Sequence, residues 1–194
     1  MMEGFYTLLA AAISATATLA SVWLGRKIMC KRKRDAIVDE TIQNGNVYTA
    51  LEFLIEEVGA DRAYVMEFHN GAHYFSGRGQ QKFSCTYETV KNGISAEFGN
   101  SQNHRISNFH HYINELVNDG QFSYTNVDAI PDTAFKTLLK DKGVSAIFNV
   151  PLKTLNGKVI GILGVDYVRS SEPFKEDMPQ FMKSQARIVA GYLL

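Results

Sequence analysis

The chain has 194 residues, and its 20 basic and 20 acidic side chains give a net charge of zero at pH 7. Apolar residues make up 45% of it and charged residues 21%, which is typical of a folded protein and excludes a disordered one. Two cysteines are too few for a disulfide framework or a four-cysteine zinc site. Residues 26–34 hold six of the bases, so residues 35–194 carry a net charge of −5. We therefore expect no nucleic-acid partner, because such a domain should present a basic face.

A run of 21 residues without a charged side chain, Phe5–Gly25, lies near the start of the sequence. As a helix it would be about 30 Å long, the thickness of the hydrocarbon core of a bilayer. The sequence therefore predicts a transmembrane anchor with a basic juxtamembrane segment over residues 1–34, and a soluble domain over residues 35–194. A cleaved signal peptide is the alternative, since Ala15-Thr16-Ala17 resembles a cleavage site, but residues 1–4 contain no base.

The basic segment after the uncharged run predicts the orientation of the anchor. Positive charge is retained on the cytoplasmic side, so we expect a single-pass membrane protein with a cytoplasmic C-terminal domain and the lipid bilayer as a partner. Ala17, Ser21 and Gly25 recur at four-residue spacing. A face of small residues lets two helices approach closely, so these three positions are candidates for helix association and predict self-association.

The soluble part alternates helical and strand patterns. The predicted elements are an amphipathic helix over 35–58, strands over 62–69 and 82–89, a helix over 107–118 capped by Ser107, a strand over 122–125, a helix over 132–142 capped by Asp132, strands over 144–152 and 159–168, and a closing amphipathic helix from Phe174 to Tyr192. Turns are predicted at Asn70-Gly71 and Asn156-Gly157. Residues of the strand over 62–69 should alternate, with Tyr64, Met66 and Phe68 on one face. Gly161 and Gly164 in the last strand predict close packing by another element. This order predicts an α+β fold, an antiparallel sheet flanked by helices, preceded by a single transmembrane helix.

Several of these segments resemble the GAF domain. The resemblance rests on Ala60–His69, Gly143–Leu152, the Asn156-Gly157 turn and Val159–Val165, and it covers about residues 38–194. The Phe68-His69-Asn70-Gly71 corner and the glycine-rich loop after it are similar to GAF-like proteins of tailed bacteriophages. The resemblance implies a binding module that holds a small ligand between the sheet and the helices over it. No cysteine stands where a bilin would be attached, so we expect no cofactor.

The predicted ligand site follows from the many aromatic residues in the middle of the chain. Strand alternation places Tyr87 on one face with Phe83 and Cys85, while Phe109 lies on the helix expected to cover the sheet. The predicted lining is Tyr87, Phe109, His110, Phe148 and Asn149. Asn149 has the opposite parity to Phe148, so both face one pocket only if a bulge intervenes, and Phe148 is favoured. The alternative is that these aromatics form an ordinary core.

No pattern indicates catalysis or a metal centre. Nucleophile elbow, phosphate loop and dinucleotide fingerprint are absent, and the five histidines lack metal-ligand spacing. The sequence therefore predicts a membrane-anchored domain for small-ligand binding or protein interaction, without enzymatic activity. The alternatives are a structural membrane or virion protein, or a bacteriophage membrane protein acting in host lysis. The layout resembles holins of the T-even type, although these place their globular domain outside the cytoplasm, opposite to the orientation that the bases predict.

Overall fold

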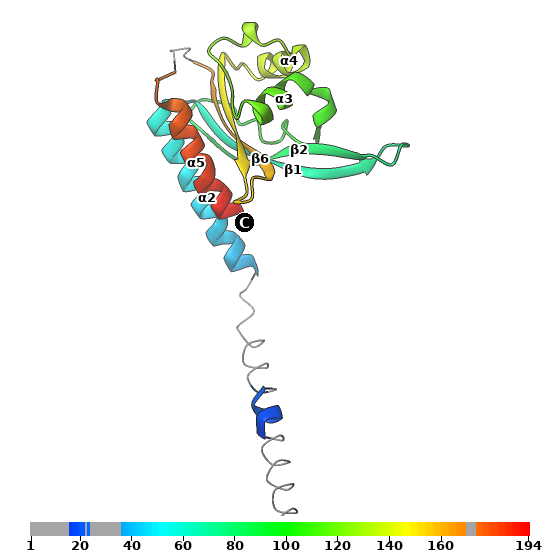
Figure 1. Cartoon of the computed structure of the whole chain (residues 1–194). Helices are drawn as coiled ribbons and strands as arrows, with labels where there is room; N and C mark the ends of the chain where they lie inside the picture. The colour runs from blue at the N-terminus through cyan, green and yellow to red at the C-terminus, as the bar shows by residue number, and fades with distance from the viewer. Residues whose placement is uncertain (1–15, 22, 24–35, 170–173) are drawn as a thin grey trace, which may run out of the picture. The chain divides into compact units, whose positions relative to one another are not determined.

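A six-stranded antiparallel sheet is the centre of the chain from Ile42 onward (Figure 1). The structure is a computed structural model that describes residues 16–21, 23, 36–169 and 174–194. Its elements are α2 (Ala36–Val58), β1 (Arg62–His73), β2 (Gly79–Val90), β3 (His104–Arg105), the 3-10 helix η1 (Ile106–Asn108), α3 (His110–Asn118), β4 (Phe122–Tyr124), the 3-10 helix η2 (Val127–Ala129), α4 (Thr133–Asp141), β5 (Ala146–Lys153), β6 (Val159–Tyr167) and α5 (Met178–Leu193). The strand order is β3-β2-β1-β6-β5-β4, with every neighbouring pair antiparallel. The predicted α+β fold is confirmed.

The predicted anchor lies largely outside the described residues. Residues 16–21 and 23 are helical, and the Ser21 hydroxyl donates to the carbonyls of Ala17 and Thr18, 2.9 Å away in each case. Gly25, the third candidate for helix association, is outside the described ranges. Within those ranges, no helix combines the length and the apolar character that a membrane span requires. The chain divides into two compact units, 1–41 and 42–194.

Each face of the sheet is covered by its own helices. On one face α2 and α5 lie side by side, and their buried residues share a core with Ala63 and Val65 of β1 (Figure 1). On the other face α3 and α4 pack over a second core, against which Met66 and Phe68 are partly buried. The predicted alternation along β1 is therefore confirmed. It is this second face that carries the polar residues described below.

A β-bulge in β2 reverses its alternation. Val65 pairs with Tyr87 and the next residue, Met66, pairs with Cys85, so Thr86 is the extra residue. Beyond the bulge Tyr87 lies on the α2 side, where its hydroxyl donates to Asn44 Oδ1 at 2.6 Å. The prediction that Tyr87 shares a face with Cys85 is wrong, because a bulge shifts all later residues of its strand by one position.

The first hairpin turns later than predicted. Strand β1 continues through Asn70-Gly71 to His73, and the turn lies at Tyr74–Arg78, where the Tyr74 amide donates to the Arg78 carbonyl at 2.8 Å. Gly71 instead permits close packing, since a Cβ there would stand 2.8 Å from the Gln80 carbonyl oxygen. An Asn-Gly pair is a turn signal in many chains, but here strand pairing outweighs it.

The remaining local predictions have mixed outcomes. Asp132 caps α4 as predicted, accepting a hydrogen bond from the Phe135 amide at 3.0 Å, and Gly157 has the positive φ of the predicted second hairpin. Ser107 is not a cap, because η1 intervenes before α3. Three apolar residues near the start of the predicted amphipathic helix, Ile37, Val38 and Ile42, are exposed, since burial on α2 begins only at Val47.

Candidate functional site

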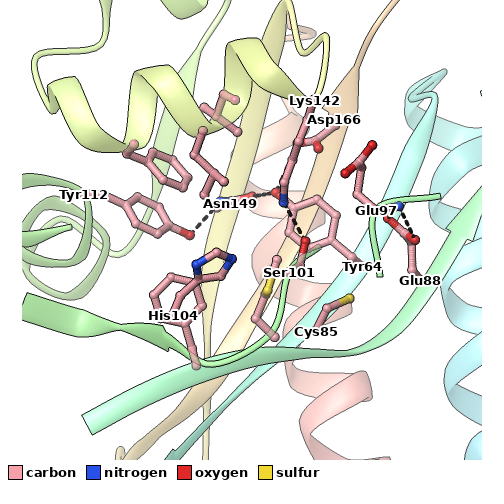
Figure 2. A pocket seen from close by; sticks show the side chains of 15 residues that line it. Tyr64, Cys85, Glu88, Glu97, Ser101, His104, Tyr112, Lys142, Asn149 and Asp166 are labelled. Carbon is pink, nitrogen blue, oxygen red and sulfur yellow. Dashed lines mark hydrogen bonds between the residues drawn. The ribbon is translucent and has the colours of Figure 1, made fainter. Parts of the chain in front are cut away.

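A small cavity lies between the sheet and the helices α3 and α4 (Figure 2). Its volume is about 20 Å³, measured as space for the centre of a water-sized sphere, and one water molecule needs roughly 10–15 Å³ by that measure. The residues that line this central cavity are Tyr64, Met66, Phe83, Cys85, Glu88, Glu97, Ser101, His104, Tyr112, Phe135, Leu138, Leu139, Lys142, Asn149 and Asp166. As it stands, the cavity has room for about one water molecule.

A buried chain of hydrogen bonds runs along its floor. The Tyr64 hydroxyl lies 2.9 Å from Asn149 Oδ1 and 3.1 Å from Asp166 Oδ1, and Asn149 Nδ2 donates to the Tyr112 hydroxyl at 2.8 Å. Gly164 makes room for this arrangement, because a Cβ there would overlap both the Tyr64 ring and Asn149 Oδ1. The close packing predicted from the glycines of β6 is thus confirmed. At Gly164 the absent side chain leaves room for the polar side chains of Tyr64 and Asn149.

A fully buried guanidinium lies behind the cavity lining, beside Asp166. Arg62 is 0% exposed, and its terminal nitrogens donate to the carbonyls of Ser95 at 3.1 Å and Lys142 at 3.0 Å. Its Nε lies 3.4 Å from Asp166 Oδ2, close enough for an ion pair but without hydrogen-bond geometry. Burial raises the pKa of Asp166 to about 6, while the charges of Arg62 and Lys142 oppose that rise.

Lys142, which follows the last residue of α4, places an ammonium group in the lining of the cavity. Its Nζ donates to Ser101 Oγ at 2.5 Å, and no ion pair of Lys142 closer than 4.0 Å occurs within the described part of the chain (Figure 2). Burial lowers the pKa of this ammonium, and the nearby Asp166 carboxylate raises it in part. A half-buried ammonium with one neutral partner has donors left for a ligand.

His104 supplies a hydrogen-bonding atom without a partner. Its Nε2 is buried and has no hydrogen bond among the described residues. Burial, followed by the charge of Lys142, lowers the pKa of this imidazole, and a hydrogen bond with the Asn100 backbone partly opposes them. His104 is therefore neutral at pH 7. A buried polar atom left unpaired costs free energy, so a water or ligand that paired with it would be stabilised.

The structure brings few of the predicted site residues together. Asn149 lines the central cavity. Phe109 does not line it but contacts His104, with the two ring centroids 5.6 Å apart. Phe148 and Tyr87 lie on the opposite face with α2 and α5, where the ring of Phe148 makes an edge-to-face contact with Phe174. His110 is exposed on α3. The preference for Phe148 over Asn149 is corrected, because β5 carries no bulge at this point and the two side chains face opposite ways.

Sequence reasoning missed most of the polar lining. The missed residues are scattered along the chain, and no motif for a polar site surrounds any of them. They are Tyr64, His104, Lys142 and Asp166. One signal was available for Asp166. It follows a long apolar stretch of β6, and a lone carboxylate at that point indicates a buried, paired group.

The thiol and metal chemistry of the site is limited. Cys85 is the free cysteine of the described residues, and its buried Sγ–H donates to the Tyr87 carbonyl at 3.3 Å. Burial raises the pKa of that thiol to about 12, which disfavours the reactive thiolate form of Cys85. Within the described ranges, no three histidine, cysteine, aspartate or glutamate side chains are grouped to hold a metal ion.

A comparison with protein families identifies the fold. The model of the GAF domain matches residues 46–193, which is most of the chain. The chain belongs to the GAF domain family. The resemblance predicted from the strand and turn patterns is thereby confirmed for the GAF domain itself. The same match agrees with the compact unit that the structure shows from Ile42 to the C-terminus.

Solved GAF structures superpose on this one with low sequence identity. The blue-light-absorbing form of the PixJ GAF domain of Thermosynechococcus elongatus has a TM-score of 0.63 at 16% identity, covering 80% of this chain and 86% of that one. A GAF region from a protein of Geobacter sulfurreducens, described as a candidate membrane protein, has a TM-score of 0.60 at 15% identity, covering 81% and 96%. A structure described as a far-red-absorbing dark state with bound biliverdin has a TM-score of 0.57 at 11% identity, covering 78% and 97%. Such identities show a shared fold. No curated protein matches the sequence.

These comparisons leave several predictions untested. They do not bear on the membrane anchor, the orientation, the bacteriophage resemblance or the lysis alternative, which all stay predictions. Of the solved structures above, the far-red-absorbing one is described with bound biliverdin. At identities of 11–16%, these structures do not indicate what the present GAF domain binds.

Proposed function

We propose that this GAF domain is a non-catalytic sensor that binds a small polar molecule in the central cavity. The observation that carries the proposal is the unpaired Nε2 of His104, buried beside the half-buried ammonium of Lys142. A purely structural core would pair or exclude such groups, because leaving them unsatisfied costs free energy. A ligand that pairs with both is therefore favoured.

The cavity indicates the chemistry of that ligand. Neutral His104 offers an acceptor lone pair at Nε2, and Lys142 offers donors. A matching ligand carries a hydrogen-bond donor and an acceptor or negative group a few atoms apart, as small amino or hydroxy acids do. Tetrapyrroles do not fit this description, and the buried thiol of Cys85 does not support covalent attachment.

Binding would also give the domain a way to signal. With about 20 Å³ available, a ligand larger than one or two waters has to displace part of the lining. The sheet side is held by strand pairing and by the buried bonds of Tyr64 and Asn149. The opposite wall consists of Tyr112 from α3 and of Phe135, Leu138 and Leu139 from α4. Occupancy would therefore move α3 and α4 relative to the sheet.

Substitutions of His104 test the site. We expect a thermal-shift screen of the detergent-solubilised full chain, with amino acids, hydroxy acids and nucleotides, to find a compound that raises Tm. His104→Phe should abolish that shift, whereas His104→Gln, which keeps an acceptor oxygen, should retain part of it. Binding should weaken as pH falls through the lowered pKa of His104, below its ordinary 6.5, because the protonated ring has no free lone pair.

The proposal has a clear contrary outcome and a matched control. His111→Phe changes an exposed histidine of α3 outside the cavity and should leave the shift intact. If no compound of these classes raises Tm, or if His104→Phe binds as wild type does, the central cavity is a filled core and not a ligand site.

Residues 1–34 complete the proposed function as a membrane anchor that allows self-association. Support comes from the uncharged run before the basic segment, and from apolar side chains exposed on α2 and α5, among them Ile42, Phe53, Ile188 and Tyr192. We expect uncleaved full-length chain to stay in carbonate-washed membranes and to crosslink as a dimer. Ser21→Leu with Gly25→Leu should reduce the crosslinking, because bulky side chains separate the helices. Recovery in the soluble fraction would contradict the anchor.

A further inference from the structure

A second hollow, separate from the central cavity, lies where α5, the end of β5 and the segment between α3 and β4 meet. Its volume is about 300 Å³. The residues that line this α5 hollow are Gly120, Pro151, Lys153, Lys183, Ala186 and Arg187. Pro151 and Ala186 are buried and form an apolar floor, while the three charged side chains are exposed or half-buried. None of these residues lines the central cavity.

The charge of the α5 hollow is uniformly positive. Lys153, Lys183 and Arg187 line it, and no acidic side chain does. Among the described residues, none of the three cations forms an ion pair or a side-chain hydrogen bond. Residues 142–165 and 178–194, which supply these cations, contain five bases and no acid. The lining itself therefore supplies no counter-charge, and the nearest acid in sequence to a lining residue is Asp119, next to Gly120.

Such an arrangement is unfavourable without a counter-charge. Lys183 and Arg187 are four residues apart on α5, so they stand on one face of the helix, where like charges repel. Lys153 adds a third positive charge from the end of β5. Gly120 has no side chain, and a Cβ at this residue would meet no atom within 4 Å, so space for a ligand remains open.

We propose that the α5 hollow binds the phosphate group of an anionic ligand. Arginine matches two phosphate oxygens with its planar fork, and the two lysines add point charges around the remaining oxygens. The phosphate can belong to a soluble phosphorylated metabolite or to a phospholipid headgroup, since both present the same oxygens.

Protection of lysines from chemical acetylation distinguishes the two sources with the full chain. The chain is reconstituted in nanodiscs of neutral phosphatidylcholine, or of phosphatidylcholine mixed with phosphatidic acid, and acetylation rates are read by mass spectrometry. Pyrophosphate is added to the neutral discs as the soluble probe. We expect Lys153 and Lys183 to be acetylated several times more slowly with a phosphate source present, while Lys82 and Lys136, which lie outside the hollow, keep their rates.

Each outcome decides the proposal. Protection by pyrophosphate in neutral discs supports a soluble ligand, and protection in anionic discs alone supports a headgroup. Arg187→Gln should raise the pyrophosphate concentration that half-protects the two lysines by about tenfold, as loss of a charge-assisted hydrogen bond implies. Arg105→Gln removes the same charge from exposed β3 and should change nothing. If both phosphate sources leave Lys153 and Lys183 unprotected, or protect Lys82 and Lys136 equally, the proposal is wrong.

Discussion

Replacing Arg62 with alanine is expected to lower the free energy of unfolding by about 3–5 kcal/mol, because removal of one partner leaves a buried charge without compensation. Arg62 has no exposed surface, and its partners are the carboxylates of Asp166 and, at 3.9 Å, Glu97, together with two backbone carbonyls. The variant strands all of them in the interior. Urea denaturation of the wild type and the variant measures the difference.

The cost of Arg62→Ala should also depend on pH. Burial raises the pKa of Asp166 above its value in the unfolded chain, and the positive charge of Arg62 lowers it in part. The pKa of Asp166 should therefore be higher still in the variant. A carboxyl group whose pKa is raised in the folded state contributes its full stability below the pKa of the unfolded chain. That stability is lost as the pH rises through the pKa of the folded state. The variant should therefore be closer to wild type at about pH 5 than at about pH 8.

Asp166→Asn in the Arg62→Ala background provides the control. The neutral amide removes the uncompensated charge, so the double variant should lose this pH dependence and recover part of the stability at about pH 8. Equal losses for Arg62→Ala at both pH values would show that Arg62 stabilises the fold through its backbone hydrogen bonds and not through Asp166.

Replacing Phe148 with alanine is expected to cost a similar amount, about 3–5 kcal/mol, by leaving a cavity in the core beneath α2 and α5. Phe148 is 1% exposed, and its ring lies 5.3 Å from that of Phe174. Because it faces away from the central cavity, the variant should leave the NMR titration of the His104 imidazole unchanged in the folded protein. Denaturation curves and the His104 titration together measure both effects.

A neighbouring substitution gives the opposite pattern. Asn149→Leu removes the amide that connects Tyr64 with Tyr112, and it should shift the His104 titration because the two residues line the same cavity. If Phe148→Ala moved that titration while costing little stability, Phe148 would belong to the central cavity, and the orientation of β5 described above would be wrong.

Local patterns in the sequence were sufficient for much of the fold. The apolar runs of β5 and β6, the cap at Asp132 and the turn at Gly157 depend on residues a few positions apart, and each was predicted close to its place. Gly161 and Gly164 were recognised as points of close packing, because a strand interior has little other use for glycine. These features, together with the order of elements, sufficed to predict the antiparallel α+β fold.

Only the tertiary structure decided which polar groups form the site. The bulge at Thr86 arises from pairing between β1 and β2, so the sequence of β2 alone does not reveal that Tyr87 turns toward α2. The bonds from Tyr64 to Asn149 and Asp166 join residues 85 and 102 positions apart, and no local spacing predicts them. Apolar character favoured Phe148 as a ligand contact over Asn149. The structure instead places Asn149 in the central cavity and Phe148 in the core on the opposite face. A buried asparagine requires hydrogen-bond partners, and Tyr64 and Tyr112 meet Asn149 only in the folded protein.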